Sequence, residues 1–266
     1  TPHRFDMKLQ VTHETRYDYQ PVVETAQHMA HLRPRDTEVQ RLVSHSLRIS
    51  PVPAQQSQTT DVYGNTRCFF SLQVPHKELL VVADSLVMTA EPLSAPPDLD
   101  SVTWEQTRDI FRYKASSAYD SAAEFVFASP GSPRHQDFID YARSSFTPGR
   151  TLFAAATELM ERIHTEFTYQ SQSTEVDTTA LAALTQRKGV CQDFAHILIA
   201  CLRSFGLPAR YVSGYLLTEP PPGQARLIGC DASHAWASVY IPAAPERTAK
   251  RRSGLDGRDA DGPGGM

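Results

Sequence analysis

Residues 189–196 read Gly-Val-Cys-Gln-Asp-Phe-Ala-His, and they place a cysteine at the start of a strongly apolar helix. From Phe194 onward, apolar side chains recur three and four residues apart, which is the spacing of one buried helical face. Residues 206–208, Gly-Leu-Pro, predict the end of that helix. Cys191 therefore lies in the first helical turn, where free backbone N–H groups and the helix dipole favour a thiolate. The position suits a nucleophile better than a packing residue.

A base for such a cysteine lies further along the chain, at His234. Residues 231–241 end in small, aromatic and β-branched side chains, which predicts a strand. An imidazole on that strand is able to accept the thiol proton and later return it to a leaving group. From the residues alone, a Cys191–His234 catalytic pair and a purely structural reading stay equally open.

The composition is that of an ordinary soluble protein. Of 266 residues, 41% are apolar and 21% charged, so the chain is able to build one large or two modest cores. A net charge of −4 opposes a nucleic-acid partner, because nucleic acids are bound by basic surfaces. No run approaches the ~18 apolar residues of a membrane span, so no membrane partner is expected.

The cysteines and the N-terminus suggest a compartment. Four widely spaced cysteines are too few for a disulfide framework, and they fit a reducing cytoplasm. Residues 1–6 have no apolar core and do not resemble a secretory signal, whereas Met7 suits a natural start. We therefore expect a cytoplasmic protein.

The first third of the chain alternates apolar and polar residues in short runs, which predicts strands. One period-2 face consists of Leu9, Val11, His13, Thr15, Tyr17 and Tyr19. Further strands are expected at residues 66–74 and 78–89, after a turn at residues 61–65. Several short strands at this spacing predict an antiparallel β-sandwich over residues 1–90.

Beyond residue 90 the pattern changes from strands to helices. Three prolines within residues 91–98 predict a linker, and residues 91–130 as a whole are interpreted as a connecting segment. Ser132 and Pro133 predict the cap and first residue of a helix over 132–146. Thr151 predicts the cap of a second helix. It carries an apolar stripe of Phe153, Ala156, Leu159, Met160, Ile163 and Phe167.

A zinc site is the metal alternative, because Cys191 with His196 and Cys230 with His234 echo paired ligand spacings. Five residues on a helix lie about 140° apart around the axis, so the first pair faces different ways. Four residues on a strand span roughly 13 Å, so the second pair is too far apart to share an ion. We therefore expect no metal. Cys201, on the apolar stripe, and Cys230 are interpreted as packing residues.

Several ordered blocks resemble the bacterial transglutaminase-like family. Residues 189–196 and 206–215 resemble its cysteine core, and residues 231–236, Asp-Ala-Ser-His-Ala-Trp, resemble its histidine block. Other blocks that fit are Phe167-Thr168-Tyr169, Asp177-Thr178-Thr179-Ala180, His31-Leu32-Arg33-Pro34, Asp61-Val62-Tyr63-Gly64-Asn65 and Pro75-His76-Lys77-Glu78-Leu79-Leu80. The resemblance covers about residues 7–241. It implies membership of the papain-like cysteine protease superfamily, with Cys191 as nucleophile and His234 as its base.

The expected fold is α+β. An N-terminal antiparallel β-sandwich at residues 1–90 would precede a papain-like transglutaminase core at residues 131–242, with helices packed on an antiparallel sheet. The resemblance implies thiol-dependent acyl transfer or hydrolysis at a peptide or protein carboxamide, through a thioester and without a cofactor. The alternative is a catalytically impaired binding or scaffold module that keeps the fold.

Residues 243–266 depart from the family pattern. The family follows its histidine strand with a turn, a tryptophan and an aspartate that orients the imidazole, whereas this segment is rich in glycine, proline and charge. Its carboxylates Asp256 and Asp259 have no apolar strand to hold them. We interpret the segment as a disordered tail that resembles an out-of-frame reading of the family's next strand. The third catalytic acid would then be missing, which leaves open whether the chain is an active enzyme.

Overall fold

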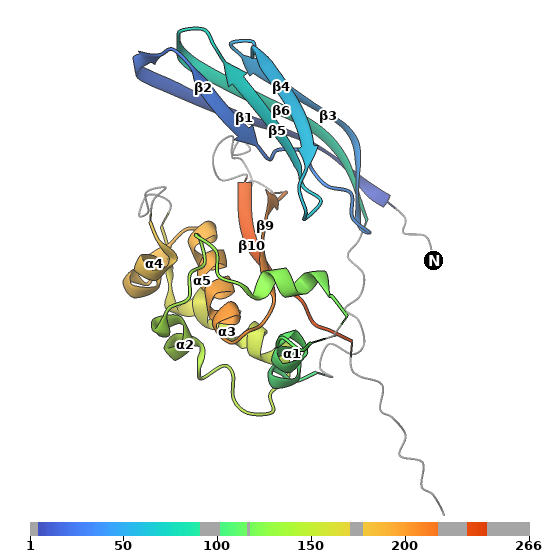
Figure 1. Cartoon of the computed structure of the whole chain (residues 1–266), viewed down its shortest axis with the longest axis vertical. Helices are drawn as coiled ribbons and strands as arrows, with labels where there is room; N and C mark the ends of the chain where they lie inside the picture. Colours follow the sequence, from blue (N-terminus) through green and yellow to red (C-terminus); the bar gives the residue numbers. More distant parts are fainter. Residues whose placement is uncertain (1–4, 91–101, 116–117, 171–177, 218–232, 244–266) are drawn as a thin grey trace, which may run out of the picture.

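The computed structural model describes residues 5–90, 102–115, 118–170, 178–217 and 233–243 of the chain. Strands form the N-terminal part, and helices around a few short strands form the rest (Figure 1).

Two three-stranded antiparallel sheets form the N-terminal part, with strand orders β1-β6-β3 and β2-β5-β4. The strands are β1 (Phe5–Val23), β2 (Ala26–Ala30), β3 (Gln40–Ser50), β4 (Gln55–Thr60), β5 (Thr66–Leu72) and β6 (His76–Ala90). Phe70 and Leu72 from one sheet pack with Leu79 and Val81 from the other in a single core. The predicted antiparallel β-sandwich is confirmed.

The period-2 pattern along β1 explains which face of this strand is covered. The partly buried residues of β1 are Leu9, Val11, His13, Thr15, Tyr19 and Val23. Tyr17, predicted on the same face, is exposed. Strand β6 pairs with β1 on one side and β3 on the other, so it is the central strand of its sheet.

The helical part is organised around one central helix. Its elements are α1 (Trp104–Phe111), the 3-10 helix η1 (Ser121–Val126), α2 (Gln136–Ala142), α3 (Leu152–Glu166), β7 (Thr168–Tyr169), α4 (Ala180–Gln186), β8 (Lys188–Gly189), α5 (Cys191–Ser204), β9 (Ala209–Tyr215) and β10 (Ser233–Val239). Helix α5 contacts α2, α3 and α4, and also the antiparallel pair β9–β10. Its predicted start and end are confirmed, and Gly206 beyond it has the positive φ that a helix stop favours.

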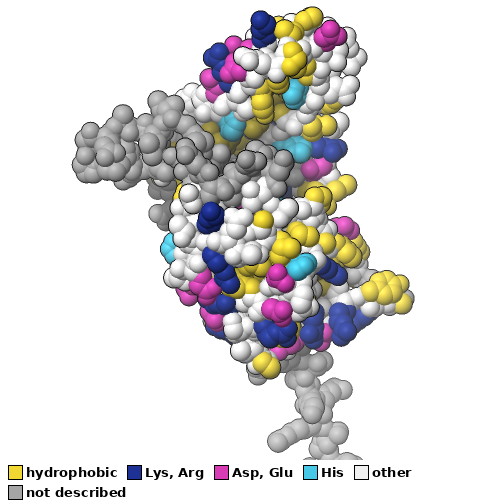
Figure 2. Space-filling model, turned by 90° about the vertical axis from the view of Figure 1, so that its left-hand side faces the viewer, with side chains coloured by type: hydrophobic (Ala, Val, Ile, Leu, Met, Phe, Trp, Pro, Cys, Tyr) yellow, Lys and Arg dark blue, Asp and Glu magenta, His cyan; other side chains and the backbone are white. Residues whose placement is uncertain are grey.

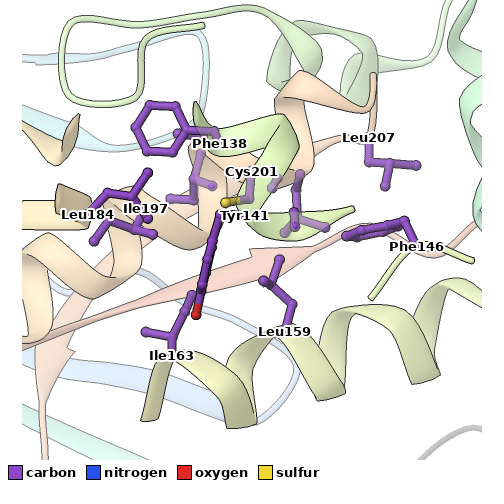
Figure 3. Packing of buried hydrophobic residues seen from close by; sticks show 14 of the residues in the cluster. Phe138, Tyr141, Phe146, Leu159, Ile163, Leu184, Ile197, Cys201 and Leu207 are labelled. Atoms are coloured by element: carbon purple, nitrogen blue, oxygen red, sulfur yellow. The ribbon is translucent and has the colours of Figure 1, made fainter. Parts of the chain in front are cut away.

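Apolar side chains from α2, α3, α4 and α5 meet in one cluster (Figure 3). Phe138, Leu159, Ile197 and Cys201 within it have almost no exposed surface. Each fully buried Leu, Ile or Phe side chain contributes about 1.5–3 kcal/mol relative to an exposed one. Burial therefore holds α5, and with it the motif at its start, in one position.

The second predicted helix is confirmed, but part of its predicted stripe is not. Thr151 caps α3 by accepting a hydrogen bond from the Ala154 N–H. Phe153 and Met160 are exposed. The buried residues of α3 are Leu152, Ala155, Leu159 and Ile163, so the buried face is rotated from the predicted one.

Helix α2 begins and ends inside the range of residues 132–146 predicted for it. Its cap is His135, whose Nδ1 accepts the Asp137 N–H. Ser132, predicted to be the cap, is buried, and its Oγ lies 3.1 Å from Nδ1 of His196. The Ser132 hydroxyl, predicted to cap a helix, therefore links the loop before α2 to helix α5.

Helix α1 lies within the predicted connecting segment. Thr103 caps it, and the buried Trp104 donates a hydrogen bond from Nε1 to the Thr147 carbonyl at 2.9 Å. The Trp104 ring also meets Phe146 and Phe205 edge to face. This helix is therefore part of the helical core.

Side chains of the two parts meet at two points. The Tyr215 hydroxyl lies 3.0 Å from Nδ1 of His13 on β1, and the ring of Tyr63 lies 5.3 Å from that of Phe125.

Basic and acidic side chains are interspersed over the helical part in Figure 2. None of the helices in the described ranges combines the length and apolarity needed to cross a membrane.

Candidate active site

Cys191 is the first residue of α5 and is partly exposed. Val190, just before it, is extended and provides no side-chain cap. The Asp193 carboxylate turns back instead, and its Oδ2 accepts the Val190 N–H at 2.8 Å. A Cβ on Gly189 would lie 2.6 Å from that same oxygen, so glycine is needed for the carboxylate to reach the helix start. The Asp193 carboxylate thus complements the positive end of the helix dipole.

Cys201 lies on the same helix but in a different environment. It is fully buried, and burial raises the pKa of its thiol to about 12. Its predicted role as a packing residue is confirmed. Cys68 is buried as well, in the β-sandwich. Of the described cysteines, only Cys191 combines partial exposure with a helix start.

His234 is the second residue of β10 and stands opposite Gly214 of β9. The residues of β10 that face the helix are small: Ala235 is buried, and Ala237 packs against the helical core. Small side chains let α5 approach the β9–β10 pair closely. The histidine therefore lies at the end of a strand that is in direct contact with the cysteine helix.

Two contacts fix how α5 lies against β9. The rings of His196 and Tyr211 stack with 4.8 Å between centroids, and Arg203 near the end of α5 donates to the Ala209 carbonyl at the start of β9. Helix α5 and β9 therefore run in opposite directions. The N-terminal end of α5 lies toward the end of β9 at which Gly214 pairs with His234.

No hydrogen bond between the Cys191 thiol and the His234 imidazole is present in the described part of the chain. The elements that carry the two residues are brought together, and the side-chain pairing itself stays a prediction.

Sequence reasoning missed the contacts of His196 on α5. Its ring lies between the ring of Tyr211 and the backbone of Gly131, with its Nδ1 at Ser132. These contacts join segments that are far apart in the sequence, so local patterns do not predict them. Tyr211 falls in the quoted motif at residues 206–215, which is the only signal that could have singled it out.

The other motif residues are placed as follows. Tyr169 on β7 pairs with Gly189, two residues before Cys191, and it is half-exposed. Gln192 is exposed. The motif positions 177 and 230–232, including Cys230, lie outside the described residues. Where the chain is described, no cluster of three or more His, Cys, Asp or Glu side chains is arranged to hold a metal ion.

Comparison with known proteins identifies the family. Residues 9–88 match the bacterial transglutaminase-like N-terminal region, and residues 139–248 match the transglutaminase-like superfamily. An uncharacterized protein of Mycobacterium tuberculosis strain H37Rv is 43% identical over 246 residues, which cover 90% of this chain and 76% of that protein. The chain belongs to the transglutaminase-like superfamily. Members of this superfamily are associated with thiol-dependent acyl transfer or hydrolysis, so this chemistry is supported at the level of the family.

Two further relatives bear on fold and chemistry. A crystal structure of a candidate cysteine protease from Cytophaga hutchinsonii superimposes with a TM-score of 0.64 at 20% identity, covering 88% of this chain and 75% of that one. A protein-glutamine gamma-glutamyltransferase of Pseudomonas aeruginosa is 28% identical over 113 residues, which cover 42% of this chain and 17% of that protein. The first likeness shows that the transglutaminase-like cysteine protease fold is shared.

Proposed function

We propose that this transglutaminase-like chain is a thiol amidase or acyltransferase in which Cys191 is the nucleophile and His234 its base. The observation that carries the proposal is the position of Cys191. A partly exposed cysteine starts a buried helix, and this helix contacts the strand that carries His234. The family provides the chemistry for which this arrangement is suited.

The reaction proceeds in two steps. His234 takes the proton of the Cys191 thiol, and the sulfur attacks the carbonyl carbon of a carboxamide or peptide bond. Backbone N–H groups at the helix start stabilise the oxyanion. The C–N bond breaks as His234 gives its proton to the leaving nitrogen, and a thioester remains on Cys191. Water then releases a carboxylic acid, or a lysine amine takes the acyl group as a new amide.

The substrate class follows from this chemistry. A glutamine side chain in a peptide or protein presents a carboxamide whose leaving group is ammonia, and the P. aeruginosa relative is named for a reaction at protein glutamine. Hydrolysis and transamidation share the first step and differ only in the acceptor. The proposal therefore covers both outcomes.

The test measures acyl transfer to water and acyl transfer to an amine in the same reaction. Purified protein is incubated with casein as glutamine donor and a fluorescent primary amine, and amine incorporation and ammonia release are measured together. Cys191→Ser and His234→Ala are expected to remove both signals, whereas Cys201→Ala retains them if it stays folded. Undiminished turnover in Cys191→Ser would contradict the nucleophile assignment.

The second candidate function is a binding or scaffold module. It is favoured by the composition of residues 243–266, which do not show the apolar strand pattern expected to carry a third acid. A module of this kind would produce neither ammonia nor amine incorporation. Its Cys191 would react with iodoacetamide no faster than an ordinary thiol.

A further inference from the structure

The N-terminal β-sandwich contacts the helical part at the end of β9 where this strand pairs with the start of β10. Tyr215, the last residue of β9, places its hydroxyl 3.0 Å from Nδ1 of His13 on β1. The two rings meet edge to face, with 5.9 Å between centroids and 68° between planes. Both side chains are partly buried. A strand of the sandwich is therefore tied to a strand of the helical part by this pair of side chains.

The hydrogen bonds of His13 hold its ring in one orientation. Its Nε2 lies 3.0 Å from Oγ1 of Thr15 on the same strand, while its Nδ1 meets Tyr215. A neutral imidazole has one donor and one acceptor nitrogen, so these two hydroxyl groups satisfy both nitrogens. Burial lowers the pKa of His13 and raises the pKa of Tyr215, which keeps both side chains neutral near pH 7. The contact is therefore an uncharged hydrogen bond between fixed partners.

The backbone pairing of β9 with β10 links this contact to His234. Tyr215 pairs with Ser233, and Gly214 pairs with His234, so the tied residue and the proposed base lie at adjacent positions of one antiparallel ladder. Both positions are at the end of the strand pair. The ends of secondary-structure elements open more readily than their centres. A tie between Tyr215 and the sandwich therefore restrains the end of the pair that carries His234.

We propose that His13 and Tyr215 are positioning residues for the reaction. Their hydrogen bond fixes the end of the β9–β10 pair, and this in turn holds the His234 imidazole where it exchanges a proton with Cys191. The inference rests on the proposed function, because it concerns the placement of the proposed base. It extends that function by giving the N-terminal β-sandwich a part in catalysis, through a residue that does not itself touch the substrate.

The second contact between the two parts provides a matched control. The ring of Tyr63, in the turn between β4 and β5, lies 5.3 Å from the ring of Phe125 on η1. Neither residue belongs to β9 or β10. Tyr63→Leu therefore weakens the attachment of the sandwich to the helical part while the His13–Tyr215 hydrogen bond stays in place. The control separates loss of that hydrogen bond from a general loosening of the two parts.

The first measurement is alkylation of Cys191 by iodoacetamide against pH, read by mass spectrometry of the peptide that contains Cys191. Tyr215→Phe keeps the ring and removes the hydroxyl, whereas His13→Phe keeps a ring and removes both nitrogens. Each is expected to raise the midpoint of the profile by about half a pH unit, because a displaced imidazolium stabilises the thiolate less. His234→Ala is expected to raise the midpoint further, and Tyr63→Leu to leave it unchanged.

Combined variants show whether the effect passes through His234. In His234→Ala the base is already absent, so the addition of Tyr215→Phe is expected to shift the profile no further. His13→Asn keeps a polar group near the position of Nδ1, so it is expected to recover part of the wild-type profile. Thermal unfolding shows which variants are folded. Tyr215→Phe removes a single oxygen atom and keeps the test decisive if the His13 variants unfold.

The second measurement is ammonia release from casein. A misplacement of about 1 Å in a catalytic group costs up to about a hundredfold in rate. Tyr215→Phe is therefore expected to lower kcat about tenfold. The KM for casein should stay within about twofold of the wild-type value, since the substitution acts on the base and not on substrate contacts.

The outcomes separate this inference from the proposed function. If His234→Ala shifts the alkylation profile while Tyr215→Phe and His13→Phe retain the wild-type profile, the positioning role is overturned and the catalytic pair stands. The positioning role is also overturned if Tyr63→Leu shifts the profile as far as Tyr215→Phe, or if Tyr215→Phe adds its shift to that of His234→Ala. If wild-type Cys191 labels no faster than a free thiol, both proposals are overturned.

Discussion

Helix α5 carries two cysteines in opposite environments. Cys191 begins the helix, where it is partly exposed and lies at the backbone N–H groups of the first turn. Cys201, nearly three turns further on, is fully buried among the apolar side chains of α2, α3 and α4, and burial raises the pKa of its thiol to about 12. The same side chain is thus partly exposed to solvent at one end of the helix, and buried and neutral near the other end.

The comparison shows how the fold separates chemistry from packing. Burial of the apolar face of α5 fixes the position of the helix start, where Cys191 itself is partly exposed. Activity and stability should therefore respond to substitutions at different residues of one helix. The following predictions test that separation.

Cys191→Ser is expected to have the largest effect, on activity. A hydroxyl does not replace the thiolate as nucleophile, and loss of a nucleophile lowers turnover by a factor on the order of 10⁴–10⁶. The free energy of unfolding should change by less than about 0.5 kcal/mol, since the residue is outside the core. Ammonia release and urea unfolding of the same preparation measure the two effects. A large loss of stability would show that the helix start is part of the core.

Cys201→Ser is expected to have the reverse effect. It places a hydroxyl in an apolar layer, at a cost of about 1–3 kcal/mol in the free energy of unfolding. Turnover of the folded fraction should stay close to that of the wild type. Urea unfolding measures the cost. If stability is unchanged, Cys201 is not in the buried environment described above.

Alkaline pH is expected to reduce the stabilising effect of Cys201. Its folded pKa is raised from the ordinary value of 9.0 to about 12, so between these values only the unfolded chain releases the proton. Stability from this residue is complete below about pH 9 and is lost as the pH rises toward 12. The stability difference between wild type and Cys201→Ala should therefore shrink by about 1 kcal/mol from pH 8 to pH 10. An equal difference at both pH values would contradict the raised pKa.

Asp193→Asn is expected to have the smallest effect. The amide keeps a hydrogen bond to the Val190 N–H but loses the charge that complements the helix dipole, which costs about 0.3–1 kcal/mol. The cost should fall at high salt. Urea unfolding at low and high ionic strength checks this, and a cost independent of salt would show that the charge itself contributes little.

The sequence predicted the parts of this structure that depend on local patterns. The β-sandwich follows from alternating residues such as Leu9 and Val11, and α5 follows from its apolar spacing and Gly206. Cys191 and His234 were singled out by motif, and the structure places them on elements that touch. The different environments of Cys191 and Cys201 were also predictable, because Cys201 lies on the apolar stripe of the helix.

What the sequence did not predict depends on contacts between distant segments. Ser132 has the local signature of a helix cap, yet its hydroxyl bonds to His196. The residues around Ser132 do not predict this contact, because His196 lies far away in the sequence. The packing of Trp104 against Phe146 and Phe205 likewise joins a segment interpreted as a linker to the core. The stacking of Tyr211 on His196 was not predicted for the same reason, since it joins β9 to α5.

The central claim is that Cys191 is accessible and reactive whereas Cys201 is buried. Its most direct test is competitive labelling of these two cysteines on α5. Native protein is treated with limiting iodoacetamide at neutral pH, unfolded in urea with a second, isotopically distinct reagent, and analysed by peptide mass spectrometry. We predict that Cys191 carries the first label and Cys201 only the second. Equal first labelling of both residues, or a Cys191 that stays unlabelled until the protein unfolds, would contradict the account.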